Sequence, residues 1–179
     1  MGVDAVHGLP SATTRRDADR LLVVDLQARR GPELYGLARR LGLSAEEADD
    51  AVQETLLRAW VALDGEEPIR QLDAWAFRTH YRICMDRHRW QRRVRRLGDR
   101  LRGRDETTSI GAVADRLTIW EVVDRLPERQ RAVVYLRYRA DLTFDEIGET
   151  LGIRPVSARS HASRALDRLG EMLREEEDR

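Results

Sequence analysis

The chain has 179 residues, of which 41% are hydrophobic and 36% charged, and its 32 basic and 32 acidic residues cancel. One cysteine, Cys84, excludes an internal disulfide and a multi-cysteine zinc site, and no two of the four histidines stand at metal-ligand spacing. The sequence shows neither a signal-peptide core nor a run of roughly 20 apolar residues that could span a membrane. We therefore expect a cytoplasmic protein that needs no cofactor.

The zero net charge is the sum of two opposed blocks. Residues 44–73 carry nine acids and two arginines, a net of −7, whereas residues 82–104 carry ten arginines and two aspartates, a net of +8. Every basic residue of the chain is an arginine, whose planar guanidinium group matches carboxylates and phosphates. This asymmetry favours one basic and one acidic partner. The alternative is that the blocks pair with each other on adjacent helices, where surface ion pairs contribute little.

Hydrophobic periodicity predicts an all-α fold of two small helical domains joined by a flexible linker. Residues 1–17 are expected to form a disordered tail, and residues 18–100 the N-terminal domain. A first helix over residues 18–30 is expected to break at Gly31-Pro32, where a second helix begins.

Ser44 and Glu47 form a predicted capping box at the start of the next helix. The apolar stripe of this helix, expected to face the core, comprises Ala48, Val52, Leu56, Ala59 and Leu63. After a loop, a long helix begins near Leu72 and continues into "DRHRWQRRVRR", residues 86–96, which holds six arginines.

Residues 101–112 are expected to be the linker, because they hold two glycines among polar residues without periodicity. The C-terminal domain is predicted over residues 113–174, followed by an acidic tail over residues 175–179. Pro127 fits the first turn of a helix inside that domain.

The segment "LTFDEIGETLGIRPVSARSHASRALDRL", residues 142–169, has the layout of a DNA-reading helix-turn-helix. Thr143 and Glu146 form a second predicted capping box, a Gly-Ile turn follows, and a longer helix begins at Pro155. Hydroxyl and guanidinium groups on its outer side and flanks can contact phosphate or fork onto guanine. These outer and flanking residues are Ser157, Arg159, Ser160, His161, Arg164 and Asp167. The alternative is an ordinary helical hairpin with a solvated face.

The acidic helix turns a polar face away from its apolar stripe. That face carries Asp50, Gln53, Glu54 and Leu57, with Asp49 at its edge. An exposed leucine beside carboxylates and an amide suits the docking of a basic partner helix. A solvated face without a partner is the alternative.

Aromatic side chains alternate with arginines along the next helix, over residues 72–96. The aromatic residues are Trp75, Phe77, Tyr81 and Trp90. Aromatic rings stack on the bases of single-stranded DNA, and guanidinium groups meet its phosphates. Helical spacing favours a core position for Trp75 and Ile83 instead, whereas Tyr81 and Trp90 are expected to be more open.

Three segments, in this order, resemble one protein family. "ELYGLARRLGLSAEEADDAVQETLLRAWVAL" resembles the second conserved region of bacterial sigma-70-type initiation factors, especially the extracytoplasmic-function (ECF) group. "DAWAFRTHYRICMDRHRWQRR" resembles the following helix, which recognises and helps open the promoter minus-ten element. "LPERQRAVVYLRYRADLTFDEIGETLGIRPVSARSHASRALDRL" resembles the fourth region, which binds the minus-thirty-five element. The long third domain of housekeeping sigma factors has no room here.

The resemblance implies a sigma factor without catalytic chemistry that brings core RNA polymerase to promoter DNA. The polymerase contacts would be the clamp helices of the largest subunit and the flap of the second-largest subunit, and family members are often held by an anti-sigma protein. The implied polymerase-binding residues are Asp49, Asp50, Gln53, Glu54 and Leu57, with Trp60 supporting them from the core. The implied minus-ten residues are Tyr81, Arg82, Arg87, Arg89, Trp90, Arg92 and Arg93. The implied minus-thirty-five residues are Arg154, Ser157, Arg159, Ser160, His161 and Arg164.

Four residues depart from the family pattern. Arg82 stands where asparagine is common and Thr79 where an aliphatic residue is common, whereas Arg154 replaces a Ser-like cap and Ala158 a larger aliphatic residue. These departures bear on which promoter sequence is read. The alternative function is a sigma-like or stand-alone helix-turn-helix regulator that does not itself initiate transcription. A nucleic-acid enzyme is not expected, because no carboxylates cluster at metal spacing and no activated nucleophile is present.

Overall fold

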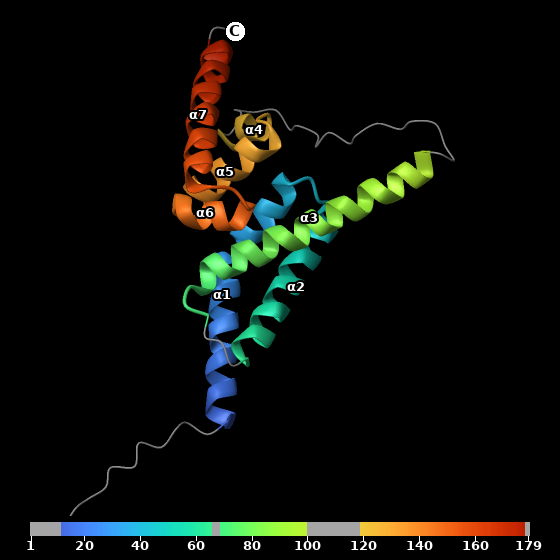
Figure 1. Ribbon diagram of the computed structural model, residues 1–179, viewed down its shortest axis with the longest axis vertical. Helices are drawn as coiled ribbons and strands as arrows, with labels where there is room; N and C mark the ends of the chain where they lie inside the picture. The colour runs from blue at the N-terminus through green and yellow to red at the C-terminus, as the bar shows by residue number, and fades with distance from the viewer. Residues whose placement is uncertain (1–11, 66–68, 100–118, 178–179) are drawn as a thin grey trace, which may run out of the picture.

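The computed structural model describes residues 12–65, 69–99 and 119–177, and their side chains over 17–65, 69–90 and 119–176. The described residues form helices without a strand, which confirms the all-α prediction (Figure 1). The helices are α1 (Ala12–Arg40), α2 (Ala45–Leu63), α3 (Leu72–Asp99), α4 (Ile119–Asp124), α5 (Glu128–Tyr138), α6 (Phe144–Leu151) and α7 (Pro155–Glu177). The predicted linker, residues 101–112, lies outside the described residues.

Helices α1, α2 and α3 pack against one another and form the N-terminal module. The predicted capping box opens α2: the Glu47 backbone N–H donates to the Ser44 hydroxyl group at 3.2 Å, and the Ser44 N–H donates to the Glu47 carboxylate at 2.9 Å. The buried side of α2 is made of small residues, namely Ala48, Ala51, Thr55 and Ala59. Small residues let α2 lie close to α1 and α3, so its bulkier side chains are left nearer the surface.

The predicted break at Gly31-Pro32 is wrong, because α1 runs through both residues as one helix. A proline inside a helix removes a hydrogen bond and costs about 3 kcal/mol. Leu26 before the proline and Leu34 and Leu37 after it are fully buried. Burial of such side chains stabilises by roughly 1.5–3 kcal/mol each, which offsets that cost. Helix α1 also begins at Ala12, so it includes six residues of the predicted tail.

Helices α4 to α7 form the C-terminal module, which contains the predicted helix-turn-helix. The second capping box is confirmed, since Glu146 N–H donates to the Thr143 hydroxyl group at 3.3 Å and the Thr143 N–H donates to the Glu146 carboxylate at 2.7 Å. Gly152 ends α6 in the left-handed conformation, with φ of 64°. Glycine adopts this conformation without steric cost. Helix α7 then starts at Pro155, as predicted, and its end covers residues 175–177 of the predicted acidic tail.

The two modules pack against each other, which the sequence did not predict. One hydrophobic core contains Leu34 and Leu37 of α1, Phe77 of α3, Leu136 of α5 and Ile147 of α6. Helix α5 lies against α1, and α6 lies against α3 (Figure 1). The modules therefore share buried apolar surface.

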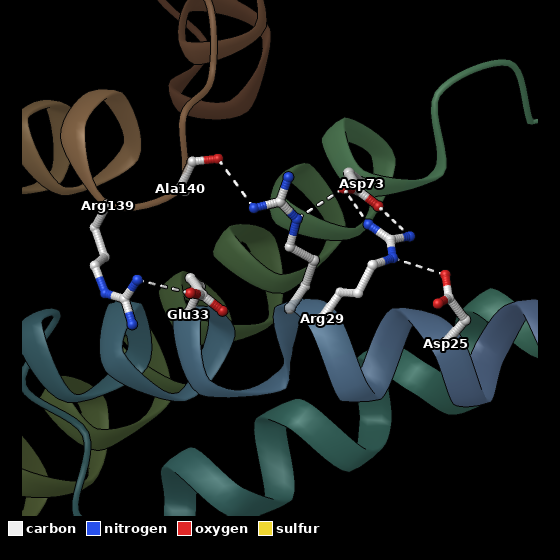
Figure 2. A network of polar contacts seen from close by, with 7 residues as sticks. Asp25, Arg29, Glu33, Asp73, Arg139 and Ala140 are labelled. Carbon is white, nitrogen blue, oxygen red and sulfur yellow. Dashed lines mark hydrogen bonds and ion pairs between the residues drawn. The ribbon is translucent and has the colours of Figure 1, made fainter.

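A polar network lies beside this shared core (Figure 2). The Asp73 carboxylate accepts hydrogen bonds from Arg29, at 2.9 and 3.2 Å, and from Arg30, at 2.7 Å. Burial raises the pKa of Asp73, but these two guanidinium groups outweigh it and hold the pKa below its usual value. Arg30 also donates to the Ala140 carbonyl oxygen at 3.5 Å, so the network reaches from α1 and α3 to the α5–α6 turn.

Candidate polymerase-binding and nucleic-acid interfaces

The acidic face of α2 points outward, as the sequence predicts. Asp49, Asp50 and Gln53 are exposed, and the Leu57 side chain is 65% exposed beside them. Glu54 is half-buried. The face therefore presents carboxylates and an apolar side chain together, a combination that suits a basic partner with an apolar centre.

Trp60 does not support this face from the core, contrary to the prediction. Its side chain is 45% exposed and that of Val61 is 67% exposed. Residues 57, 60 and 61 are neighbours on a helix surface, because residues three and four apart share a face. Leu57, Trp60 and Val61 therefore form an apolar ridge that continues the acidic face. The three- and four-residue spacing of these side chains is visible in the sequence. Which side of α2 faces inward became clear only from the structure, where the small residues of the helix are the buried ones.

Arg87 belongs to the acidic face rather than to a free arginine surface. Its guanidinium group lies 3.5 Å from the Asp50 carboxylate and 3.2 Å from that of Glu54, and it donates to the Glu47 carbonyl oxygen at 3.3 Å. A cavity of about 260 Å³ lies beside Arg87 and Glu54 and is lined by these two, Arg58, Trp90 and two other residues of α3. Among the described side chains, the two opposed charge blocks thus pair in part, through Arg87.

The predicted minus-ten residues lie on two sides of α3. Tyr81, Arg82 and Arg89 line a cavity of about 330 Å³ together with Glu149 and Gly152 at the end of α6. Burial raises the pKa of Tyr81, which is half-buried there. Arg87 and Trp90 lie on the side that faces α2. The structure therefore does not gather these residues into one surface.

The predicted minus-ten residues differ in how far their side chains are exposed to solvent. Trp90 is 65% exposed, and Arg82 is exposed. Arg89 is exposed and pairs only with Asp86 of its own helix, at 3.4 Å, among the described ion pairs. Arg92 and Arg93 lie on α3 beyond the described side chains. Trp90, Arg82 and Arg89 are therefore the exposed members of this set among the described side chains.

The predicted minus-thirty-five residues lie on the outer side and flanks of α7, apart from Arg154, which directly precedes that helix. Arg154, Arg159, Ser160 and Arg164 are exposed, while Ser157 and His161 are half-buried. Ala158 is fully buried, so this departure from the family pattern lies in the core. The Arg159 guanidinium carbon lies 5.6 Å from the centre of the Phe144 ring, which holds the arginine near the start of the helix.

Two contacts order the rest of this surface. The Ser160 hydroxyl group donates to the Val156 carbonyl oxygen at 3.0 Å, and the Arg164 Nε donates to the Ser160 carbonyl oxygen at 3.1 Å. Burial, followed by the nearby Arg164 and Arg129, lowers the pKa of His161. His161 is therefore held neutral to a lower pH than a free imidazole, and the positive charge of the surface comes from its arginines.

The turn of the helix-turn-helix depends on Gly148. A Cβ atom at this position would lie 2.8 Å from the Ile153 carbonyl oxygen and 3.3 Å from the Pro155 nitrogen. Both neighbours are backbone atoms, which cannot give way as a side chain can. Gly148 therefore sets the close approach of α6 to the start of α7.

A buried polar group between α2 and α3 was missed from the sequence. The Thr55 hydroxyl oxygen and His80 Nδ1 lie 2.9 Å apart, and His80 Nε2 lies 3.5 Å from the Cys84 Sγ. Burial lowers the pKa of His80 to about 4 and raises the pKa of Cys84 to about 12. Both side chains are therefore uncharged near neutral pH. The Thr55–His80 hydrogen bond joins α2 to α3 inside the N-terminal module.

The described residues offer neither a metal-ligand cluster nor a membrane-spanning helix. Within them, no three His, Cys, Asp or Glu side chains gather as metal ligands would. No helix among them combines the length and apolar character that crossing a bilayer requires.

These features define a class of protein: an all-α chain with a helix-turn-helix module and an exposed acidic, partly apolar face on the other module. Comparison with known proteins identifies one family, which matches the chain in two regions. Residues 26–94 match the family model of sigma-70 region 2, and residues 116–169 match that of sigma-70, region 4.

Related sequences and solved structures are also sigma factors. RNA polymerase sigma factor CnrH of Cupriavidus metallidurans is 32% identical over 182 residues, covering 88% of this chain and 95% of the relative. CnrH in complex with the cytosolic domain of CnrY has a TM-score of 0.61 at 25% identity, covering 90% and 94% of the two chains. Sigma factor RpoE in complex with the anti-sigma factor NepR from Bartonella quintana has a TM-score of 0.63 at 25% identity, covering 88% and 96%. The chain belongs to the sigma-70 family, in its ECF group, and is a sigma factor for transcription initiation.

Proposed function

We propose that the acidic face of α2 and the apolar ridge beside it bind core RNA polymerase, while α3 and α7 hold the two promoter elements. The observation that carries this proposal is that Asp49, Gln53 and Leu57 are exposed together on α2, so carboxylate, amide and apolar groups are presented on one helix. The partner helix would be basic, as in the clamp of the largest polymerase subunit. Charge complementarity across such a face speeds association and selects the partner.

Each of the two modules would bind its own set of partners. Residues 18–100 would bind polymerase and the minus-ten element, and residues 113–174 would bind the minus-thirty-five element and the flap of the second-largest subunit. Trp90, Arg82 and Arg89 would stack on bases and hold phosphates of the opened strand. Arg154, Arg159, Ser160 and Arg164 would meet duplex DNA, with Ser157 and His161 at the edge of that surface. The chain would supply recognition, and polymerase would supply the chemistry.

An anti-sigma protein is the second proposed partner. RpoE is described in complex with an anti-sigma factor. The apolar ridge of Leu57, Trp60 and Val61 is an exposed surface that such a protein could cover. Polymerase and promoter DNA are cytoplasmic in bacteria, so we propose the same location for this chain.

Reconstitution tests the proposal. The purified chain plus core polymerase should initiate at discrete promoters, identified by mapping transcript starts after overexpression. Asp49→Arg should abolish polymerase binding, because it places a cation on the acidic face without breaking the pairs of Arg87. Glu171→Arg, an exposed charge reversal on α7, is the matched control. Normal polymerase binding by Asp49→Arg would place the docking face elsewhere. Promoter binding without initiation would favour a stand-alone regulator.

A further inference from the structure

One arginine of α3 lies along the acidic face of α2 and contacts three acceptors on it. The Arg87 guanidinium group is 3.5 Å from the Asp50 carboxylate and 3.2 Å from that of Glu54. It also donates to the Glu47 carbonyl oxygen at 3.3 Å. Residues 47, 50 and 54 share one side of α2, because residues three and four apart are neighbours on a helix surface. A cation from another helix therefore lies within the acidic face itself.

A second cation contacts the same glutamate. Arg58, one turn further along α2, pairs with the Glu54 carboxylate at 2.7 Å. The two arginines take different oxygens, since Oε1 of Glu54 meets Arg58 and Oε2 meets Arg87. Hydrogen bonds between charged groups are stronger than those between neutral groups. Both oxygens of Glu54 therefore already accept from charged donors of this chain, and its negative charge is neutralised internally.

The other carboxylates of this face are more available to a partner. Asp49 is exposed and has no ion pair among the described side chains. The Asp50 side chain is 58% exposed, and its contact with Arg87 is the longer of that arginine's two ion pairs. A basic partner would therefore meet Asp49 directly, whereas Glu54 is already occupied. The acidic face thus presents less negative charge than its sequence suggests.

The contact between Arg87 and Glu54 is open to exchange with an outside cation. The two side chains are 28% and 35% exposed, and exposed ion pairs contribute little free energy. The cavity of about 260 Å³ beside them is also lined by Arg58 and Trp90. Since liquid water occupies about 30 Å³ per molecule, this cavity has room for the head group of a partner's side chain. Without Arg87, a partner's cation could therefore reach Glu54.

We propose that Arg87 is a positioning residue of the acidic face: it occupies Glu54 in the free protein and thereby directs the cation of the polymerase helix to Asp49. This inference rests on the proposed function, because the basic partner is the helix of core RNA polymerase. A cation kept within the face repels an incoming cation, and charges at an interface rim act mainly on the association rate and its salt dependence. Arg87 therefore limits how fast polymerase binds and selects where it makes contact.

The first test measures association of full-chain variants with core polymerase at several salt concentrations. Arg87→Gln should speed association, steepen its salt dependence and tighten the Kd about threefold, the size typical of one partly exposed ion pair. Arg87→Lys keeps the charge and should bind as the wild type does. Arg20→Gln removes an exposed arginine of α1 and is the control for net charge, so its Kd should not change. Circular dichroism of each variant checks that it is folded.

A double-mutant cycle separates occupation of Glu54 from net charge. Glu54→Gln should weaken polymerase binding only slightly in the wild-type background, because its carboxylate is already paired. In the Arg87→Gln background the loss should be larger by at least about twofold, the lower end of coupling between contacting residues. Equal losses in the two backgrounds would overturn the proposal, since they would reduce Arg87 to a charge at a distance. Weaker binding by Arg87→Gln would also overturn it.

Carboxyl footprinting of the free protein gives a readout that needs no polymerase. A carbodiimide couples accessible carboxylates to an uncharged amine, and mass spectrometry measures the labelling of each site. Glu54 should label more slowly than Asp49 in the wild type and faster in Arg87→Gln, with Asp49 unchanged. Equal Glu54 labelling in the two chains would overturn the proposal whatever the binding data show. Faster labelling without polymerase binding by any chain, the wild type included, would contradict the proposed function and with it the docking role of Arg87.

Discussion

The Arg87 guanidinium group lies 3.2 Å from the Glu54 carboxylate, and this contact joins the arginine-rich helix α3 to the acidic face of α2. Arg89, two residues further on, pairs only within its own helix among the described ion pairs. Neighbouring arginines of one basic block therefore do different work. One holds the two helices together, and the other is left for a partner.

Replacing these two arginines separates the roles. Arg87→Ala should lower the free energy of unfolding by about 1 kcal/mol, because it removes partly exposed ion pairs. It should leave the salt dependence of promoter binding by the holoenzyme unchanged. Arg89→Ala should leave stability unchanged and reduce the salt slope by about 1, the effect of one lost phosphate contact. Urea unfolding measures the stability of each variant, and salt titrations of DNA binding measure its salt slope. Loss of stability in Arg89→Ala with a smaller salt slope in Arg87→Ala would reverse the roles assigned to the two arginines.

We expect the apolar ridge to contribute a large share of the free energy of polymerase binding. Trp60→Ala should weaken core polymerase binding by about 2 kcal/mol, roughly thirtyfold in Kd, because buried tryptophans dominate interface energies. The stability of the free protein should change little, since the side chain is 45% exposed. Leu166→Ala, on an exposed leucine of α7, is the control for loss of surface hydrophobicity. Equal affinities of the two variants would remove the ridge from the docking surface.

The helix-turn-helix predicts opposite effects for two glycines. Gly148→Ala should destabilise the C-terminal module and abolish binding to minus-thirty-five duplex DNA, because its Cβ would meet backbone atoms of the turn. Gly170→Ala should stabilise α7 by about 0.5–1 kcal/mol, the usual gain within a helix. Thermal unfolding and fluorescence anisotropy with labelled duplex measure the two effects. Wild-type DNA affinity in Gly148→Ala would show that the turn tolerates a shift there.

The buried histidine predicts a pH dependence of stability. Burial lowers the pKa of His80 to about 4 from an ordinary value of 6.5, so the unfolded chain binds a proton between these values that the folded chain does not. Stability from neutral His80 is therefore present above pH 6.5 and is lost as the pH falls toward 4, by about 3 kcal/mol. Urea unfolding across this range measures the loss. His80→Gln should flatten the profile, whereas His161→Gln, nearer the surface, should change it little.

Much of the local structure was predictable. The capping boxes at Ser44 and Thr143 and the start of α7 at Pro155 depend on side chains within a few residues, so the sequence carried the full signal. The outward face of α2 followed from helical periodicity in the same way. Trp60 escaped that reasoning because its direction depends on how closely α1 and α3 approach the small residues of α2.

The sequence by itself determined the all-α class, the two capping boxes, the order of the modules and the family to which they belong. Tertiary structure alone decided that α1 continues through Pro32, that Arg87 faces the acidic face of α2 and that Tyr135 of α5 packs against Gly36 of α1. The physical reason is range. Helix periodicity and capping arise from neighbours within one or two turns, whereas these three outcomes depend on packing between residues up to about a hundred positions apart, such as Tyr135 and Glu33.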